Sequence, residues 1–223
     1  MKTLKVEKLN TLSEKGKIVS TYKSMKDSDV WQLFLDGNGE AFNHIYYNYF
    51  PILFNYGHQF CQDRALVKDA VQELFIYLKE KRKKLGQTNN IKFYLYKCLR
   101  RNILKALSKN KNIVYVDNLP STADFEISIS HETFMIRNQS QIEIKRRLEQ
   151  GIEKLTKRQK EAIIYYYYEG FNYEQIAELM MFSKAEYARK LVYRSLDTLK
   201  KYVPETLILT WLGSVSVLQK GIF

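Results

Sequence analysis

Apolar residues recur at intervals of three or four positions over most of this chain, a spacing that predicts helices. In the first half, the pattern predicts a helix from Asp27 that breaks at 36–39 and resumes to Phe50, a helix over 64–78, and another over 91–109. Only nine glycines and three prolines interrupt the 223 residues. The sequence therefore predicts an all-α fold.

Three helix-start signatures follow one another in the second half of the chain. The segments Thr156–Gln159, Asn172–Gln175 and Ser183–Glu186 each resemble a capping box. In such a box the first side chain accepts a hydrogen bond from the third helical amide, and the Gln or Glu side chain bonds back to the first backbone amide. These signatures predict where three helices begin.

The last two predicted helices, about 173–180 and 184–201, are separated by a short turn, which is the spacing of a helix-turn-helix. Gly170 is expected to end the helix before them, because glycine tolerates the left-handed closing conformation. In the last helix, one face is apolar and is predicted to point inward. The opposite face, directed toward solvent or DNA, carries Lys184, Ala185, Arg189, Lys190, Tyr193 and Arg194. This face is expected to fit a major groove.

Between 112 and 140 the helical pattern fades, and proline, serine and acidic residues predict a flexible linker. The sequence thus predicts two small helical domains, 27–111 and 141–203, of which the second is a helix-turn-helix. A basic extension covers 1–26, and an apolar tail covers 204–223. The tail is expected either to cap the second domain or to bind a partner protein.

The charge is strongly basic and unevenly distributed. The chain has 36 Lys and Arg against 24 Asp and Glu, a formal net charge of +12. Twelve of the basic residues lie in 79–111 against a single acid, Glu80, and three aromatic residues are interleaved with them. Cations release counterions from phosphates and aromatic rings stack on unpaired bases, so this segment predicts a nucleic-acid surface. The alternative is a solvated basic helix face with buried tyrosines.

The sequence contains no pattern typical of a metal or catalytic site. Cys61 and Cys98 form no CxxC pair, and His131-Glu132 is not followed by the second histidine of HExxH because Met135 stands there. No carboxylate cluster with metal spacing and no phosphate-binding glycine loop is present. We therefore expect no metal, no cofactor and no enzymatic activity.

We also expect no membrane insertion. The longest apolar stretch, 207–218, contains four interrupting polar or glycine residues and is shorter than the ~20 residues that span a bilayer. Residues 1–26 carry seven lysines and no apolar core of a secretory signal. The protein is expected to be soluble and cytoplasmic.

A basic aromatic bundle followed by a helix-turn-helix resembles the extracytoplasmic-function class of bacterial RNA polymerase sigma factors. Asp69-Ala-Val-Gln-Glu-Leu-Phe75 resembles the family helix that binds core polymerase, and Tyr94-Leu-Tyr96 with Arg101-Asn102 resembles the helix that opens and reads the minus-ten element. Tyr94 stands where the family usually has tryptophan. The segments Leu155–Gln159, Glu169–Phe171, Tyr173–Glu178 and Arg189–Arg194 resemble the region that reads the minus-thirty-five element.

The resemblance implies a role for each group of residues. Core polymerase binding is expected at Asp69, Gln72, Glu73 and Phe75. Minus-ten DNA binding is expected at Lys83, Lys84, Asn89, Asn90, Tyr94, Lys97, Arg100, Arg101 and Asn102. Minus-thirty-five binding is expected at the outward residues of the last helix named above. The loop 81–91 is expected either to hold one extruded nucleotide or to be a disordered basic connection.

The implied partners are bacterial core RNA polymerase, promoter DNA and an anti-sigma factor. The apolar tail and the Arg-Lys-Leu-Val-Tyr-Arg sequence of 189–194 are most similar to the iron-citrate-type subgroup of the Bacteroidetes. The alternative function is a helix-turn-helix repressor or activator that does not act as a polymerase subunit. The charge of 79–111 argues against this alternative, because an effector domain has little use for eleven net positive charges.

Overall fold

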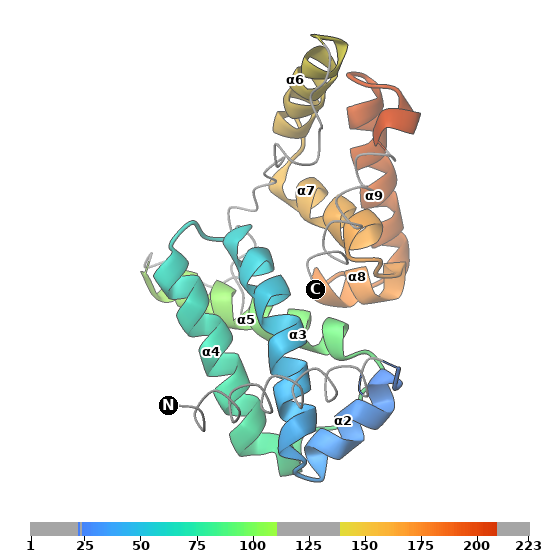
Figure 1. Ribbon diagram of the computed structural model, residues 1–223. Coiled ribbons are helices and arrows are strands. Elements are labelled where there is room, and N and C mark those ends of the chain that lie inside the picture. Colours follow the sequence, from blue (N-terminus) through green and yellow to red (C-terminus); the bar gives the residue numbers. More distant parts are fainter. Residues whose placement is uncertain (1–21, 23, 111–138, 209–223) are drawn as a thin grey trace, which may run out of the picture. The chain divides into compact units, whose positions relative to one another are not determined.

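The computed structural model describes residues 22, 24–110 and 139–208. Within this part of the chain all regular secondary structure is helical, and two compact units are formed (Figure 1). One unit contains residues up to Gly57 together with Arg64–Ile103, and the other contains His58–Asp63 and the residues from Leu104 onward. The expectation of an all-α fold in two parts is confirmed. The basic extension, except for its last residues, and nearly all of the expected linker lie outside the described residues.

The described part of the first unit contains four helices, and a short basic turn lies between the third and the fourth (Figure 1). Its elements are α2 (Asp27–Leu35), α3 (Gly39–His58), α4 (Arg64–Lys81), the short 3-10 turn η1 (Arg82–Lys84) and α5 (Ile91–Asn110), of which the last residue of α3 and the end of α5 from Leu104 belong to the other unit. The sequence predicted one helix interrupted at 36–39. The interruption instead separates two helices, α2 and α3.

Two adjacent residues make this separation sharp. Gly37 has φ +97°, and the amides of Gly37 and Asn38 bond back to the carbonyls of Phe34 and Leu33 at 3.0 and 2.9 Å, the pattern of a Schellman helix end. The Asn38 side chain then accepts hydrogen bonds from the amides of Glu40 and Ala41 at 2.9 and 3.0 Å. Gly37 thus ends α2, and Asn38 begins α3.

Aromatic rings fill the space between α3 and α4. The Phe75 ring lies edge-on to Phe42 and Tyr46, with centroids 6.3 and 4.9 Å away, and 6.5 Å from Phe50. Gly57 brings α3 close to α4, because a Cβ atom there would lie only 2.6 Å from a methyl carbon of Val67. This packing gives α4 one buried face and leaves its opposite face in solvent.

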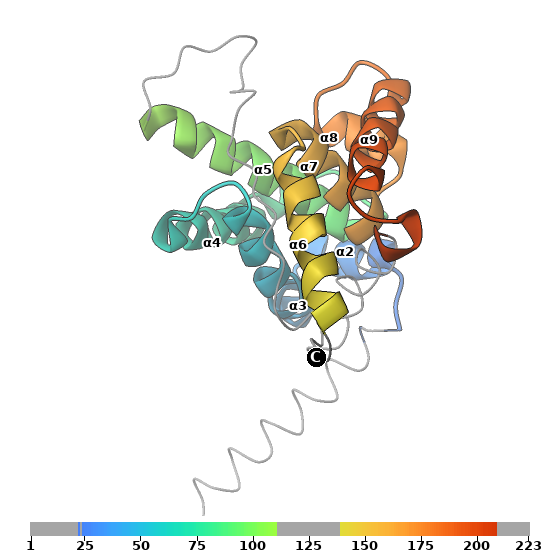
Figure 2. The same cartoon turned by 90° about the horizontal axis from the view of Figure 1, so that it is seen from above.

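The second unit is built around its last long helix. Its elements are α6 (Gln139–Glu153), α7 (Lys157–Ile163), the π-helical turn η3 (Ile164–Tyr168), α8 (Tyr173–Leu179) and α9 (Ala185–Lys200). Both α7 and α8 pack against α9, as Figure 2 shows from above. The inward residues of α9 are buried: Ala188, Val192, Ser195, Leu196 and Leu199. The predicted helix-turn-helix is therefore confirmed.

Two of the three predicted capping boxes are present. At Thr156 and at Asn172, the side chain accepts from the third helical amide, and Gln159 or Gln175 bonds back to the cap amide. The third prediction was wrong. Helix α9 is capped by Lys184 rather than Ser183, without a side-chain hydrogen bond, and the Glu186 carboxylate instead lies 3.4 Å from the Lys190 ammonium.

Gly170 closes the π-helical turn with φ +71°, as predicted. Before it, Tyr165 is fully buried and its hydroxyl donates a 2.7 Å hydrogen bond to the Glu161 carboxylate. The Tyr166 ring stacks on Tyr173, the first residue of α8, with centroids 4.7 Å apart and planes 7° apart. The tyrosine run therefore joins the end of η3 to the start of α8.

After α9 the described chain continues to Ile208, which is fully buried, and the Lys200 ammonium pairs with the Glu205 carboxylate at 2.9 Å. The remaining apolar tail lies outside the described residues. Among the helices that the structure describes, none combines the length and apolarity needed to cross a membrane.

Candidate nucleic-acid interface

The solvent face of α4 carries most of the residues expected to bind polymerase. Asp69, Gln72 and Glu73 are exposed, whereas Phe75 is 3% exposed and packs into the aromatic cluster between α3 and α4. The interpretation of Phe75 as a contact residue therefore does not fit the structure, because its ring is part of the core. Sequence analysis missed Ile76 and Tyr77, which are 57% and 49% exposed beside Glu73. Their signal was an apolar pair outside the buried stripe of α4.

The loop between η1 and α5 is held by hydrogen bonds with two side chains of α2. The indole of Trp31, itself completely buried, donates a 2.9 Å hydrogen bond to the carbonyl of Gly86. The side chain of Gln87 donates to that of Gln32. These contacts join residues 55 positions apart and do not fit the alternative of a disordered loop.

The start of α5 is fixed in the same way. The Asp27 carboxylate accepts a 2.7 Å hydrogen bond from the amide of Ile91, and the Asn90 side chain accepts one of 2.9 Å from the amide of Phe93. Both bonds satisfy amides that a helix start leaves without partners. Asn90, which was expected to bind DNA, thus caps α5 with its side chain. The capping role of Asp27 was not predicted.

The remaining residues expected at the minus-ten strand lie on η1, the loop and α5. Exposed members of the set are Lys83, Lys84, Asn89, Lys97 and Arg101, and half-buried members are Asn90, Tyr94, Arg100 and Asn102. The structure therefore places the whole set on η1, α5 and the loop that joins them, within one unit.

Tyr94 occupies a half-buried position between α2 and α5. Its ring centroid lies 5.0 Å from that of Trp31, with the planes tilted by 57°. Burial, and then the neighbouring Cys98 thiol, raise the pKa of the Tyr94 hydroxyl above its ordinary value of 10.0. The hydroxyl is thus neutral at physiological pH, and the ring is supported on one side by tryptophan.

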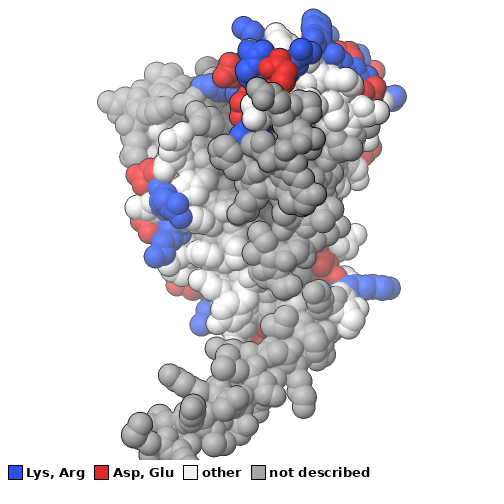
Figure 3. Space-filling view, turned by 45° about the horizontal axis from the view of Figure 1, so that its top comes forward, with Lys and Arg blue, Asp and Glu red and all other residues white. Residues whose placement is uncertain are grey.

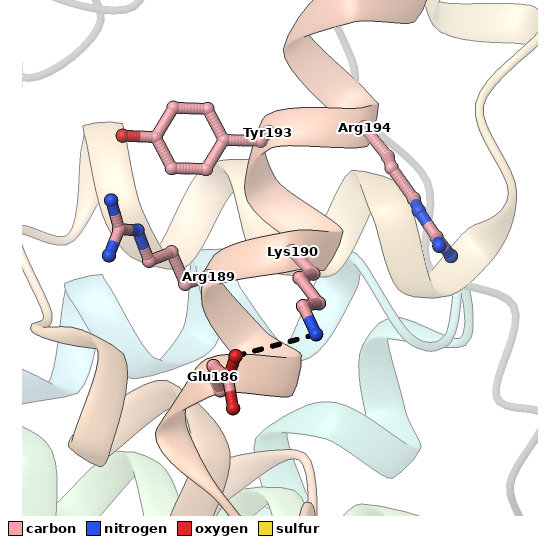
Figure 4. A pocket seen from close by; sticks show the side chains of 5 residues that line it. All are labelled: Glu186, Arg189, Lys190, Tyr193 and Arg194. Carbon is pink, nitrogen blue, oxygen red and sulfur yellow. Dashed lines mark ion pairs between the residues drawn. The ribbon is translucent and has the colours of Figure 1, made fainter.

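The face of α9 directed away from α7 and α8 forms an open hollow. It is lined by Glu186, Arg189, Lys190, Tyr193 and Arg194, as Figure 4 shows. All but Glu186 belong to the set of six residues expected to bind the minus-thirty-five element. The two members of that set that do not line the hollow lie at the start of the helix, where Lys184 is exposed and Ala185 is half-buried.

Two contacts organise the side chains of this hollow. The Arg189 guanidinium lies 5.5 Å from the centroid of the Tyr193 ring, and the Lys190 ammonium pairs with the Glu186 carboxylate (Figure 4). Arg189 and Tyr193 extend to one side of the helix, and Lys190 and Arg194 extend to the other. Cations therefore lie on both sides of the helix. A helix that binds in a major groove has one phosphate backbone on each side, so this arrangement of charges suits such a groove.

Helix α6 has a different surface. Figure 3 shows basic and acidic side chains intermixed over this part of the second unit. The Glu143 carboxylate bonds to both Arg146 and Arg147 at 2.9 Å, and these bonds lower the Glu143 pKa to about 2. Because its arginines are paired within the helix, α6 lacks the uncompensated basic face of α9.

Among the residues that the structure describes, no group of three or more His, Cys, Asp or Glu residues could hold a metal ion. Cys61 and Cys98 are free thiols. The sites on α4, on the loop with α5, and on α9 are built from charged side chains, amides and aromatic rings.

Comparison with known protein families gives two matches along the chain. Residues 45–113 match Sigma-70 region 2, and residues 145–191 match Sigma-70, region 4. Together these ranges cover just over half of the 223 residues. The first includes α4, the loop and α5, and the second includes α7, α8 and the first half of α9. Among curated proteins, none matches the chain.

Proposed function

Because the chain belongs to the sigma-70 family and has regions 2 and 4 of an extracytoplasmic-function sigma factor, we propose that its two units divide promoter recognition between them. Proteins of this family are DNA-binding regulators rather than enzymes. The chain binds core RNA polymerase and promoter DNA, and it directs promoter recognition and the initiation of transcription. Polymerase supplies the catalysis.

In this proposal the solvent face of α4 docks on core polymerase. The support is a set of exposed side chains of mixed chemistry, two acids and an amide beside the apolar pair Ile76 and Tyr77. Exposed large apolar residues next to charges are typical of a protein interface, since the apolar surface supplies burial and the charges supply orientation. Glu73 lies within this set and does not contribute to the core.

The loop and α5 bind the minus-ten strand. Cations at Lys83, Lys84 and Arg101 neutralise phosphates, and the half-buried Tyr94 ring can stack on an unpaired base, which is worth about 1 to 3 kcal/mol. The observation that supports this most is the anchoring of the loop by Trp31. A rigid loop binds a displaced base without a large loss of conformational entropy on binding.

The outer face of α9 binds the minus-thirty-five element. Arg189, Lys190, Tyr193 and Arg194 all lie on the face that α7 and α8 leave uncovered, and this observation carries the assignment. Arginine is the side chain best suited to two parallel hydrogen bonds with guanine in the major groove. Arg189 is the first candidate for a base contact, and Lys190 and Arg194 are candidates for phosphate contacts.

Three finer assignments rest on the sequence. The tail after Pro204 and the Arg189–Arg194 segment support membership of the iron-citrate-type subgroup of the Bacteroidetes. The apolar tail supports an anti-sigma factor as a regulatory partner. Since core polymerase and promoter DNA are cytoplasmic, the protein is assigned to the cytoplasm.

The proposal is tested with purified protein and bacterial core RNA polymerase. We expect the two to co-elute and to start transcription at one class of promoter selected from a random DNA library. A helix-turn-helix repressor or activator would bind duplex DNA and leave core polymerase unable to initiate. That second outcome would refute the proposal.

A further inference from the structure

We infer that Arg158 is a positioning residue for upstream promoter recognition: it holds the turn between α8 and α9 and so sets the direction in which α9 presents its DNA-binding face. Arg158 lies on α7 and is not part of the hollow on α9. The inference deepens the proposed function and rests on it, because it assumes that α9 contacts the minus-thirty-five element.

The turn that Arg158 contacts is conformationally unfavourable. Helix α8 ends with the amides of Met181 and Phe182 bonded to the carbonyls of Glu178 and Ala177 at 3.3 and 2.8 Å, a Schellman motif. The left-handed position of this motif usually holds glycine. Here it holds Met181, with φ 57°, and this is the single non-glycine residue with positive φ in the described part of the chain. A Cβ atom in this conformation costs free energy, so the turn needs support from outside.

Arg158 supplies this support on both sides of Met181. Its guanidinium donates a 2.9 Å hydrogen bond to the carbonyl of Met180 and lies 4.6 Å from the centroid of the Phe182 ring. The Met180 carbonyl is at the C-terminal end of α8, where carbonyls lack partners within the helix. A planar guanidinium can donate the hydrogen bond in its plane and stack its flat face on the ring at the same time, whereas an ammonium has no flat face to stack.

The same end of α7 also holds α9 directly. The hydroxyl of Ser195, a buried residue of α9, donates to the carbonyl of Leu191 in its own helix at 2.7 Å and also lies 3.3 Å from the carbonyl of Gln159. Arg158 and Gln159 therefore connect one end of α7 to the turn before α9 and to the body of α9. The loss of Arg158 is expected to free the turn while the buried contacts of α9 keep the unit folded.

The test measures binding of the complete holoenzyme to a duplex promoter selected by that holoenzyme from a random library. We expect Arg158→Ala to weaken binding about ten-fold, the order of effect of one charged hydrogen bond with a ring contact. Arg158→Lys keeps the charge but loses the planar contact with Phe182, and we expect it to weaken binding about three-fold. Lys154→Ala, which removes an exposed cation near the start of α7, is the matched control and should leave binding unchanged.

The decisive variant restores the turn without restoring the arginine. Met181→Gly removes the cost of the left-handed conformation, so the double variant Arg158→Ala with Met181→Gly should bind within about three-fold of the unsubstituted protein. The slope of log affinity against log salt should be the same for Arg158→Ala as for the unsubstituted protein. Thermal melting confirms that each variant is folded.

Four results would overturn the inference. They are unchanged binding by Arg158→Ala, full affinity of Arg158→Lys, failure of Met181→Gly to rescue, or a salt slope lower by about 0.9, which would make Arg158 a phosphate ligand. Arg189→Ala is measured in the same assay. If Arg189→Ala alters neither affinity nor sequence preference, α9 is not the DNA-binding helix and the proposed function itself fails, whatever the result at Arg158.

Discussion

Trp31 anchors the loop between η1 and α5, and the proposal that this loop binds the minus-ten strand can be tested by weakening the anchor. Trp31→Phe keeps an aromatic ring in the core but removes the indole amine that donates to the Gly86 carbonyl. The lost hydrogen bond is worth about 1 kcal/mol, and the smaller buried ring costs about 1 kcal/mol more. We therefore expect the free energy of unfolding to fall by about 2 kcal/mol.

The loss of the hydrogen bond from Trp31 to Gly86 should also impair promoter opening by more than the lower stability explains. Without the indole donor, the middle of the loop is tied to α2 by the exposed and therefore weak side-chain bond between Gln32 and Gln87, while its end at Ile91 stays bonded to Asp27. We expect the holoenzyme to open its promoter about five- to ten-fold less efficiently. Urea denaturation measures the first effect, and fluorescence of 2-aminopurine placed in the minus-ten strand measures the second.

Val67→Ala is the matched control, because Val67 is fully buried beside Gly57 and its truncation costs a similar free energy, about 2 kcal/mol, between α3 and α4. Val67→Ala should lower the free energy of unfolding as much as Trp31→Phe does. Under conditions in which both variants are folded, it should leave promoter opening at full efficiency. Equal opening defects in Trp31→Phe and Val67→Ala would show that global stability, and not the loop, limits opening. Unchanged opening in Trp31→Phe would refute the role of the anchor.

Four other predictions follow from single side chains. Glu73→Lys should weaken co-elution with core polymerase more than about ten-fold without lowering the melting temperature, since the side chain is exposed. Arg189→Ala should cost about 1 to 3 kcal/mol in upstream binding if it contacts a base, and an unchanged sequence preference in a selection experiment would remove it from the DNA-binding set. Met181→Gly alone should raise the free energy of unfolding by about 1 kcal/mol, whereas Met181→Ala, which keeps the Cβ atom, should give no such gain in urea denaturation. Because the Tyr94 pKa is raised in the folded state, its neutral form contributes stability that is present below pH 10 and lost as the pH rises through the tyrosine range. Tyr94→Phe should therefore flatten the fall in stability measured between pH 9 and 11, and an unchanged slope would contradict this.

Local patterns predicted the helices because their cause is local. The buried face of α9 follows from a 3.6-residue period, and the caps at Thr156 and Asn172 need only a partner three residues away. The false cap at Ser183 satisfies the same pattern. There the helix begins one residue later, with Lys184 as its N-cap, so Ser183 lies outside the cap position. A local pattern does not distinguish two starts that differ by one residue.

The candidate site was predicted only in part, because a local motif does not separate its exposed residues from its buried ones. A motif names a stretch of helix, but burial divides that stretch, so Glu73 points to solvent while Phe75 enters the core. The helical period contained this information, because Phe75 lies one turn from Val71 and from Leu78, which are both buried. The contacts of Trp31 with Gly86 and of Asp27 with Ile91 could not be predicted, because they join residues more than fifty positions apart.

The start of α7 shows how such distant contacts control a binding surface. The Thr156 side chain and the Gln159 side chain cap each other's amides, the Arg158 guanidinium bonds to the turn before α9, and the Gln159 carbonyl lies 3.3 Å from the Ser195 hydroxyl of α9. Three of four successive residues thus contact the start of one helix, the turn before another and that other helix. None of them lines the hollow on α9. We therefore expect upstream specificity to depend also on residues outside the outer face of α9, because a major-groove contact tolerates only a small change in the direction of its helix.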